Sequence, residues 1–244
     1  MNGLFSALSG AKAQEIYLSK VTNNLANVNT TGYKSDYPSF ESFFAGNGGN
    51  ITKNKMASSA VSIVKMNEGI DTAQGPIKIT GNPLDLAIEG DVFFVVNTPK
   101  GERYSRNGNF TLDSDGMLVT NSGLPVEGEK GVISITGKDI VISEDGNIVV
   151  DGKNAGKIRL VSVDDKKNLL KEGGNIFNLK STGKITEPQS YKIVQGSLEM
   201  SNVNTIREMT RLISISRAYE AYQKTMQSID DTNSKTINTI GRAD

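Results

Sequence analysis

The sequence predicts an α+β fold, in which long N- and C-terminal helices form a coiled-coil domain and the middle of the chain is a mainly antiparallel β domain. Two observations support this prediction. Residues ~3–28 and ~205–240 repeat apolar side chains every three or four positions, which is the period of a helix. Between them, short runs of alternating apolar and polar residues end in glycine, asparagine or aspartate, as strands and turns do.

The N-terminal helix is predicted from a single stripe of mostly apolar residues at intervals of three and four, which is the spacing of a coiled-coil seam. Small residues begin the stripe, one polar residue interrupts it, and turn formers at Asn29 and Gly32 follow it. The stripe consists of Leu4, Ala7, Ala11, Gln14, Leu18, Val21 and Leu25.

The C-terminal helix is predicted to be longer, because the same alternation continues from Ile206 to Ile240, roughly 50 Å at 1.5 Å per residue. Thr205 and Glu208 fit a capping box at its start, and Gly241 suits its C-terminal cap. Its seam consists of Leu212, Ile215, Tyr219, Tyr222, Met226 and Ile229.

Each seam is narrower than the apolar stripe of a helix that packs on a globular core. The two helices could simply pack on the middle domain. They could also pair with each other and leave apolar residues for other copies of the chain to cover. The second interpretation makes Leu4, Ala11, Leu18, Val21 and Leu25, with the six C-terminal seam residues, the expected subunit interface.

The middle of the chain is divided by turn pairs such as Asn107-Gly108, Asp115-Gly116 and Asp145-Gly146, which predict repeated hairpins. The predicted strands include RYSRNGNFTL at 103–112 and YKIVQGSLEM at 191–200. The expected organisation is a terminal helical assembly domain (1–35 and 203–244), an extended connecting arm (36–74) and a β-rich domain (75–202).

Composition argues against several classes of function. The 244 residues include no histidine and no cysteine, the usual ligands of zinc and copper, and no metal or other cofactor is expected. The charges of the 27 basic and 27 acidic residues cancel, which disfavours non-specific electrostatic binding of nucleic acid. No apolar run reaches the ~20 residues that span a bilayer. The N-terminus lacks the basic region of a cleaved signal peptide.

The few motifs that resemble chemical sites have simpler explanations. Asp113-Ser114-Asp115-Gly116 has its glycine at the fourth position instead of the sixth position of a calcium loop, so it is predicted to be a hairpin turn. The acidic pairs Asp164-Asp165 and Asp230-Asp231 lie in polar surroundings typical of a solvated face. The prediction is a protein without catalytic residues.

Three segments in the same order resemble the flagellar basal-body rod protein family. The first, LSGAKAQEIYLSKVTNNLANVNTTGYK, resembles the N-terminal signature of rod and hook proteins. The second, TGNPLDLAIEGDVFFVV with YSRNGNFTLDSDGMLVTNSGLPV, is similar to the family's β domain, and the third, GSLEMSNVNTIREMTRLISISRAYEAYQKTMQSID, to its C-terminal helix. The family-motif residues of the first segment are Asn24, Leu25, Ala26, Asn27, Gly32 and Tyr33, with Thr31 and Lys34 beside them.

The resemblance implies a structural subunit that self-assembles into a helical tube and transmits torque across the periplasm. It also implies export through the flagellar type III apparatus without a cleaved signal peptide, and contacts with copies of itself and with neighbouring rod proteins. No nucleic acid or small-molecule substrate is implied. Length and the ending AYEAYQKTMQSIDDTNSK most resemble the proximal rod protein of the F type.

Alternatives remain at this stage. Within the family, they are the distal rod protein of the G type and a short hook-type subunit. In other classes, they are a β-rich binding module with helical oligomerisation tails and a carboxylate-based hydrolase.

Overall fold

The computed structural model describes the backbone of residues 2–44 and 62–240, and the side chains within residues 6–38 and 69–236. It divides into two compact units. The first, the helical unit, comprises Met1–Thr22, Asp36–Gly69 and Met209–Asp244. The second, the β unit, comprises Asn23–Ser35 and Ile70–Glu208. The domain division expected from the sequence stays a prediction.

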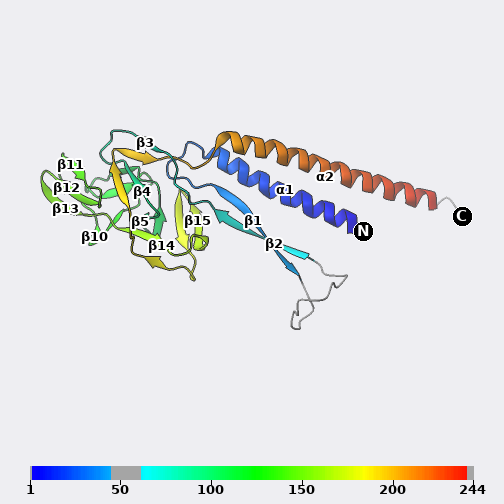
Figure 1. Ribbon diagram of the computed structural model, residues 1–244, viewed down its shortest axis with the longest axis horizontal. Coiled ribbons are helices and arrows are strands. Elements are labelled where there is room, and N and C mark those ends of the chain that lie inside the picture. Colours follow the sequence, from blue (N-terminus) through cyan, green and yellow to red (C-terminus); the bar gives the residue numbers. More distant parts are fainter. Residues whose placement is uncertain (1, 45–61, 241–244) are drawn as a thin grey trace. The chain divides into compact units, whose positions relative to one another are not determined.

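The described residues form two α-helices, α1 (Asn2–Ala26) and α2 (Thr205–Ile240), drawn in blue and in orange to red in Figure 1. The predicted fold class is wrong in its helical part. Helix α1 is short, with 25 residues against 36 in α2, and the described residues contain no long N-terminal coiled-coil helix. Small residues replace the large apolar knobs of a coiled coil in the first turns of α1, which include Ala7, Gly10 and Ala11.

Asparagine side chains and backbone turns explain where the helices begin and end. At the end of α1, the Asn27 side-chain amide donates to the carbonyl oxygen of Asn23 at 2.9 Å, and the same oxygen also accepts the backbone N–H of Asn27 at 3.2 Å. At the start of α2, Oδ1 of Asn204 accepts the N–H of Arg207 at 3.0 Å, as an N-cap does. The cap therefore lies one residue before the predicted capping box.

In the helical unit, β1 (Asp36–Phe44) and β2 (Ser62–Ile70) form a two-stranded sheet. The ring of Tyr37 on β1 lies over Gly69 on β2, where a Cβ added to the glycine would be 2.4 Å from Cε2 of the tyrosine. The aromatic ring thus fills the space that a side chain at Gly69 would take.

The β unit is antiparallel throughout its paired strands. Its largest sheet has the order β15-β16-β6-β5-β14-β17. The strands of this sheet are β5 (Phe93–Thr98), β6 (Gly101–Ser105), β14 (Leu160–Val163), β15 (Leu169–Gly173), β16 (Ile176–Leu179) and β17 (Ile185–Thr186). The short helix η1 (Lys166–Asn168) precedes β15.

Smaller sheets complete the β unit. Three strands pair in the order β11 (Ile140–Ile142), β12 (Asn147–Val150) and β13 (Lys153–Lys157). Two-stranded pairs join β3 (Ile77–Ile79) to β19 (Ser197–Glu199), β4 (Leu86–Glu89) to β18 (Lys192–Gln195), β7 (Phe110–Leu112) to β8 (Leu118–Thr120), and β9 (Glu127–Gly128) to β10 (Gly131–Val132).

Strand β5 separates two apolar cores, because successive side chains of a strand point to opposite faces. Phe94 and Val96 belong to the larger core, while Phe93 and Val95 belong to a smaller one. The Phe94 ring packs edge-on against Phe110, with centroids 5.0 Å apart. All four β5 side chains are at most 1 % exposed, so this strand is the centre of the β unit.

Two predicted strands are each divided, and both divisions place residues of the functional site. Gly196 has a φ of +70°, which splits residues 191–200 into β18 and β19 and lets β19 pair with β3 instead of continuing along β4. Residues 103–112 are split between β6 and β7, and Arg106 lies in the connection.

Neither helix is long and apolar enough, over its described residues, to cross a membrane.

Candidate functional site

The residues predicted to form the subunit interface lie on α1 and α2 with different degrees of burial. Ala11, Val21 and Ile215 are buried. The side chain of Leu4 lies outside the described residues. The remaining predicted interface residues are half-buried; they are Leu18, Leu25, Leu212, Tyr219, Tyr222, Met226 and Ile229. Most of the predicted seam is thus only partly covered within one chain.

One contact shows how the two helices meet in the helical unit. The ring of Tyr222 on α2 lies directly over Gly10 on α1, so that a Cβ added to Gly10 would be 2.5 Å from Cε1 of the tyrosine. The helices lie side by side in Figure 1, as this contact requires. Glycine at this position allows the ring to approach the α1 backbone.

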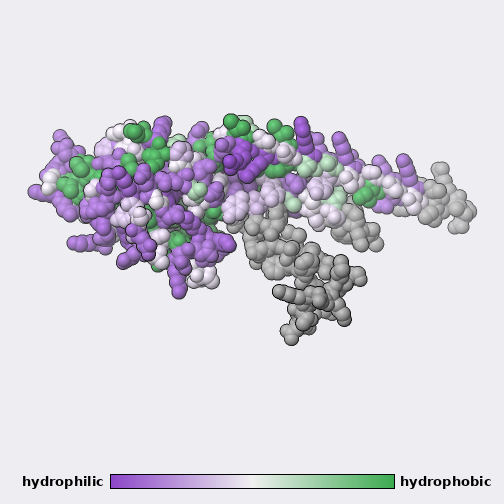
Figure 2. Space-filling view, in the orientation of Figure 1, coloured by the Kyte–Doolittle hydropathy of each residue, from purple (hydrophilic) through white to green (hydrophobic). Residues whose placement is uncertain are grey.

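A second set of apolar residues on α2 is exposed, and sequence analysis did not select it. Ile206, Met209 and Ile213 are 78 %, 50 % and 53 % exposed, and their spacing of three and four puts them on one face. On α1, Leu8 is 54 % exposed. Figure 2 shows hydrophobic residues reaching the surface along α2. Their helical spacing can be seen in the sequence, but only one apolar stripe was assigned to this helix, and these three residues lie outside it.

The family-motif residues lie at the end of α1 and in the loop that follows it, within the β unit. The hydroxyl group of Tyr33 donates to Oδ1 of Asn24 at 3.1 Å, and both side chains are buried. Gly32 has a φ of +67°, and a Cβ there would lie 2.4 Å from the backbone nitrogen of Asn107. Asn27 ends α1, Leu25 is half-buried and Ala26 is exposed.

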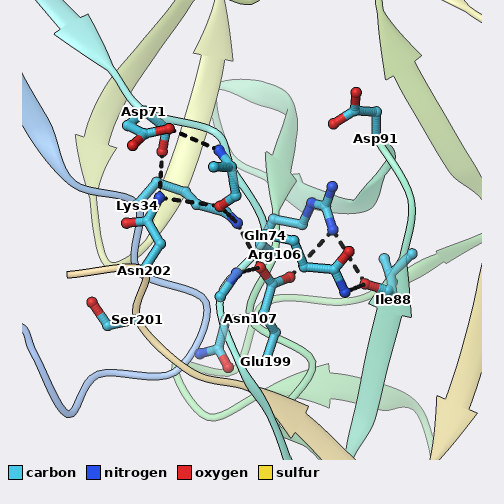
Figure 3. Close-up of polar contacts among 12 residues, drawn as sticks. Lys34, Asp71, Gln74, Ile88, Asp91, Arg106, Asn107, Glu199, Ser201 and Asn202 are labelled. Atoms are coloured by element: carbon cyan, nitrogen blue, oxygen red, sulfur yellow. Dashed lines mark hydrogen bonds and ion pairs between the residues drawn. The ribbon is translucent and has the colours of Figure 1, made fainter. Parts of the chain in front are cut away.

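Directly after this loop, three charged side chains meet in the interior of the β unit (Figure 3). Nζ of Lys34 lies 2.5 Å from Oε1 of Glu199, and Nη1 of Arg106 lies 3.2 Å from Oε2 of the same carboxylate. The side chains of Lys34 and Glu199 are completely buried, and that of Arg106 is 1 % exposed. We call these three residues the buried triad.

Backbone groups add hydrogen bonds to the buried triad, although Nε of Arg106 has no hydrogen-bond partner among the described residues. Lys34 donates to the carbonyl oxygen of Ala73 at 2.8 Å, and Oε1 of Glu199 accepts the N–H of Gly75 at 2.8 Å. Arg106 donates to the carbonyl oxygens of Ile88 and Gly90. Because burial of an ion is tolerated only with partners of this kind, the triad is stable only as a set.

Burial also changes the acid–base behaviour of the triad. Burial lowers the pKa of Lys34 below its ordinary value of 10.5; the Glu199 carboxylate opposes this effect, whereas Arg106 adds to it. Burial likewise lowers the pKa of Arg106, against the opposing influence of Glu199 and Asp91. The cluster holds two cations and one carboxylate, so one positive charge exceeds the paired negative charge.

Lys34 stands beside the family motif in the sequence, but no member of the triad was predicted to be a site residue. Lys34 follows the motif directly, whereas Arg106 and Glu199 stand in segments that resemble ordinary strands. Nothing in the local pattern relates these three positions, because the contact depends on the tertiary fold. Among the described residues, no group of three acidic, histidine or cysteine side chains is placed to hold a metal ion.

Comparison with known families covers both ends and the middle of the chain. The family described as "Flagella basal body rod protein" matches residues 4–34. The family "Flagellar hook protein FlgE/F/G D1 domain" matches residues 87–150, and "Flagellar basal body rod FlgEFG protein C-terminal" matches residues 194–239. The three matches include all members of the buried triad.

Curated relatives match over nearly the whole chain. The flagellar basal-body rod protein FlgF of Caulobacter vibrioides is 35 % identical over 247 residues, covering 99 % of this chain and 98 % of the relative. FlgF of Mesorhizobium japonicum is 32 % identical, and the rod protein FlgG of Bacillus subtilis is 30 % identical, each over 98 % of both chains. These matches confirm the family resemblance found in the sequence and associate the chain with the flagellar basal body and its other rod proteins. The chain belongs to the flagellar basal-body rod protein family and is a structural subunit of the rod.

Proposed function

We propose that this subunit polymerises with copies of itself through α1 and α2 to form part of a helical tube, and that the tube transmits torque across the periplasm. The supporting observation is the incomplete cover of the apolar helix residues. Seven predicted interface side chains are only half-buried, and Ile206, Met209 and Ile213 are exposed. Full burial of an exposed apolar side chain stabilises by roughly 1.5–3 kcal/mol, so an assembly that covers these residues gains up to that amount for each exposed one and less for each half-buried one.

The proposed position is the proximal rod. The relatives FlgF of Caulobacter vibrioides and Mesorhizobium japonicum, at 35 % and 32 % identity, favour the F type over the distal G type, for which Bacillus subtilis FlgG is 30 % identical. The margin between the types is small, so the distal position is the second candidate.

Export and partners follow from the same proposal. The subunit leaves the cytoplasm through the flagellar type III export apparatus and joins the rod in the periplasm. Its partners are copies of itself and the rod proteins above and below it. The subunit acts without catalysis, which agrees with a chain that contains no histidine or cysteine.

Cryo-electron microscopy of isolated basal bodies tests this proposal. A strain that lacks the gene is complemented with the wild-type chain, and density in the rod is fitted with the β unit and the helices. Copies are expected in the proximal rod, with α1 and α2 in contact with neighbouring copies. Copies in the distal rod instead would support the second candidate, and absence from the rod would overturn both.

A further inference from the structure

The buried triad connects segments of the β unit that lead to three of the four passages of the chain between the two units. The four passages occur at residues 22–23, 35–36, 69–70 and 208–209. Lys34 precedes the second passage by two residues, and Gly75, bonded to Glu199, follows the third passage by six. Glu199 itself lies on the last strand before α2.

Asn202 adds a second tie beside the triad, labelled in Figure 3. Its Oδ1 accepts the N–H of Ser35 at 2.8 Å, and its Nδ2 donates to the carbonyl oxygen of Asp71 at 2.8 Å. The N–H of Asp71 in turn donates to the carbonyl oxygen of Ser35 at 2.8 Å. One side chain thus joins segments that enter and leave the β unit at three of the passages.

The motif segment, residues 23–35, depends on these ties for its place. Its backbone donates from Gly32 to the carbonyl oxygen of Glu199 at 2.8 Å, and the Thr31 hydroxyl donates to Oδ1 of Asn107 at 2.9 Å. The side-chain amide of Asn175 donates to the carbonyl oxygen of Thr31 at 2.8 Å. All these partners belong to the β unit, so the segment needs no neighbouring subunit to be held.

We infer that Glu199 is the positioning residue of the motif segment, and that the buried triad fixes residues 23–35 in the β unit before assembly. In an unassembled subunit, order therefore extends to Asn23 and Glu208, and only the helix beyond those residues waits for neighbours. The second part of this statement rests on the proposed function, whereas the role of Glu199 does not.

The charge of the triad makes this attachment depend on Glu199. Among the residues whose side chains are described, Glu199 is the single carboxylate bonded to both buried cations. Asp71 and Asp91 act on Lys34 and Arg106 respectively, but both aspartates are exposed. Without the Glu199 charge, two cations remain in a desolvated site, and the most direct relief is release of the Lys34 segment into water.

Hydrogen exchange of the purified full-length subunit tests the inference. The amides of Gly32 and Ser35 are the reporters, and those of Phe94 and Val96 on β5 report the core. In the wild type, the reporters are expected to be protected while residues 6–22 exchange rapidly. Glu199→Gln is expected to accelerate exchange at both reporters by about 100-fold or more, with β5 still protected.

Two comparison variants and the wild-type exchange pattern decide the result. Glu89→Gln on β4, which removes an exposed carboxylate, should leave the reporters unchanged. Adding Lys34→Met to Glu199→Gln removes one of the two unpaired cations and should restore part of the protection, which a loss of shape alone would not allow. Reporters that exchange as fast as residues 6–22 in the wild type, or a double variant no better than Glu199→Gln, would overturn the inference.

If Glu199→Gln fails to fold, the exchange pattern of the wild type still tests whether the motif segment is held in the unassembled subunit. The result can also be told apart from a failure of the proposed rod assembly. If the reporters are unprotected but cryo-electron microscopy still places the subunit in the rod, only the attachment of residues 23–35 to the β unit is rejected. If the reporters are protected but the subunit is absent from the rod, only the proposed rod assembly is rejected.

Discussion

Nζ of Lys34 lies 2.5 Å from Oε1 of Glu199, although the two residues are 165 positions apart in the chain. This contact joins the loop after the N-terminal helix to the strand before the C-terminal helix. A completely buried ion pair between such distant segments is sensitive to the loss of either partner, but not equally.

The two partners should differ in the cost of their removal. Glu199→Ala leaves Lys34 and Arg106 buried without a carboxylate, so the free energy of unfolding should fall by about 3–5 kcal/mol. Lys34→Met leaves the Arg106–Glu199 pair intact and should cost no more than about 1.5 kcal/mol. Urea unfolding, followed by the β signal in circular dichroism, measures both values. Equal losses would contradict the excess positive charge assigned to the triad.

Alkaline pH should stabilise the fold through Lys34. Its pKa is lowered in the folded state by burial, so between that value and 10.5 the unfolded chain binds the proton and the folded chain does not. The free energy of unfolding should therefore rise with pH in that window and level off above 10.5. Unfolding of the wild type and of Lys34→Met across this range isolates the effect, because the variant should lack the rise.

Gly32 and Gly81 provide a matched test of the motif loop. Both have a left-handed φ, at +67° and +78°, but a Cβ at Gly32 meets the Asn107 backbone whereas Gly81 has nothing within 4 Å. Gly81→Ala should cost about 1–2 kcal/mol from the backbone alone. Gly32→Ala should cost about 1–3 kcal/mol more, because the loop must move away. Thermal unfolding compares them, and similar melting temperatures would show that the loop is not packed as described.

Enlarging Gly10 should disturb the packing of the helices and spare the β unit. A side chain there displaces the Tyr222 ring, so Gly10→Val should reduce swimming in soft agar while β-unit stability stays within about 0.5 kcal/mol of the wild type. Ser19→Val adds the same side chain at an exposed position of α1 and is the control for helix propensity. Wild-type motility in Gly10→Val would mean that the Tyr222 contact is unimportant in the rod.

Assembly and folding should be separable by opposite substitutions. Replacing Tyr219 and Tyr222 together by Asp places charges in the proposed seam, so the variant should fold with the wild-type β signal and build no rod. Phe93→Ala removes a side chain that packs edge-on against Phe177 in the β unit, so the free energy of unfolding should fall by about 3–5 kcal/mol. Circular dichroism and electron microscopy of basal bodies provide the two measurements. If the double variant folds and still builds rods, the predicted seam is not part of the assembly surface.

The family, the β character of the middle and the existence of both helices could be predicted from the sequence alone. The helices are visible because their apolar periodicity is local, and the hairpins are visible because turn residues such as Asp113 and Gly116 act over four positions. The family motif was also visible, with Gly32 and Tyr33 in one short segment. These properties depend on neighbours in the chain.

The packing of α1, the division of the predicted strands and the buried triad became visible only in the folded structure. The α1 stripe suggested a coiled coil, but the Tyr222 ring of α2 lies over Gly10, a residue of α1 outside that stripe. Gly196 splits a strand that the alternation predicted to be continuous, and so brings Glu199 to β3. Lys34, Arg106 and Glu199 carry no shared local pattern, because a charge is stable in the interior only where distant segments supply its partners.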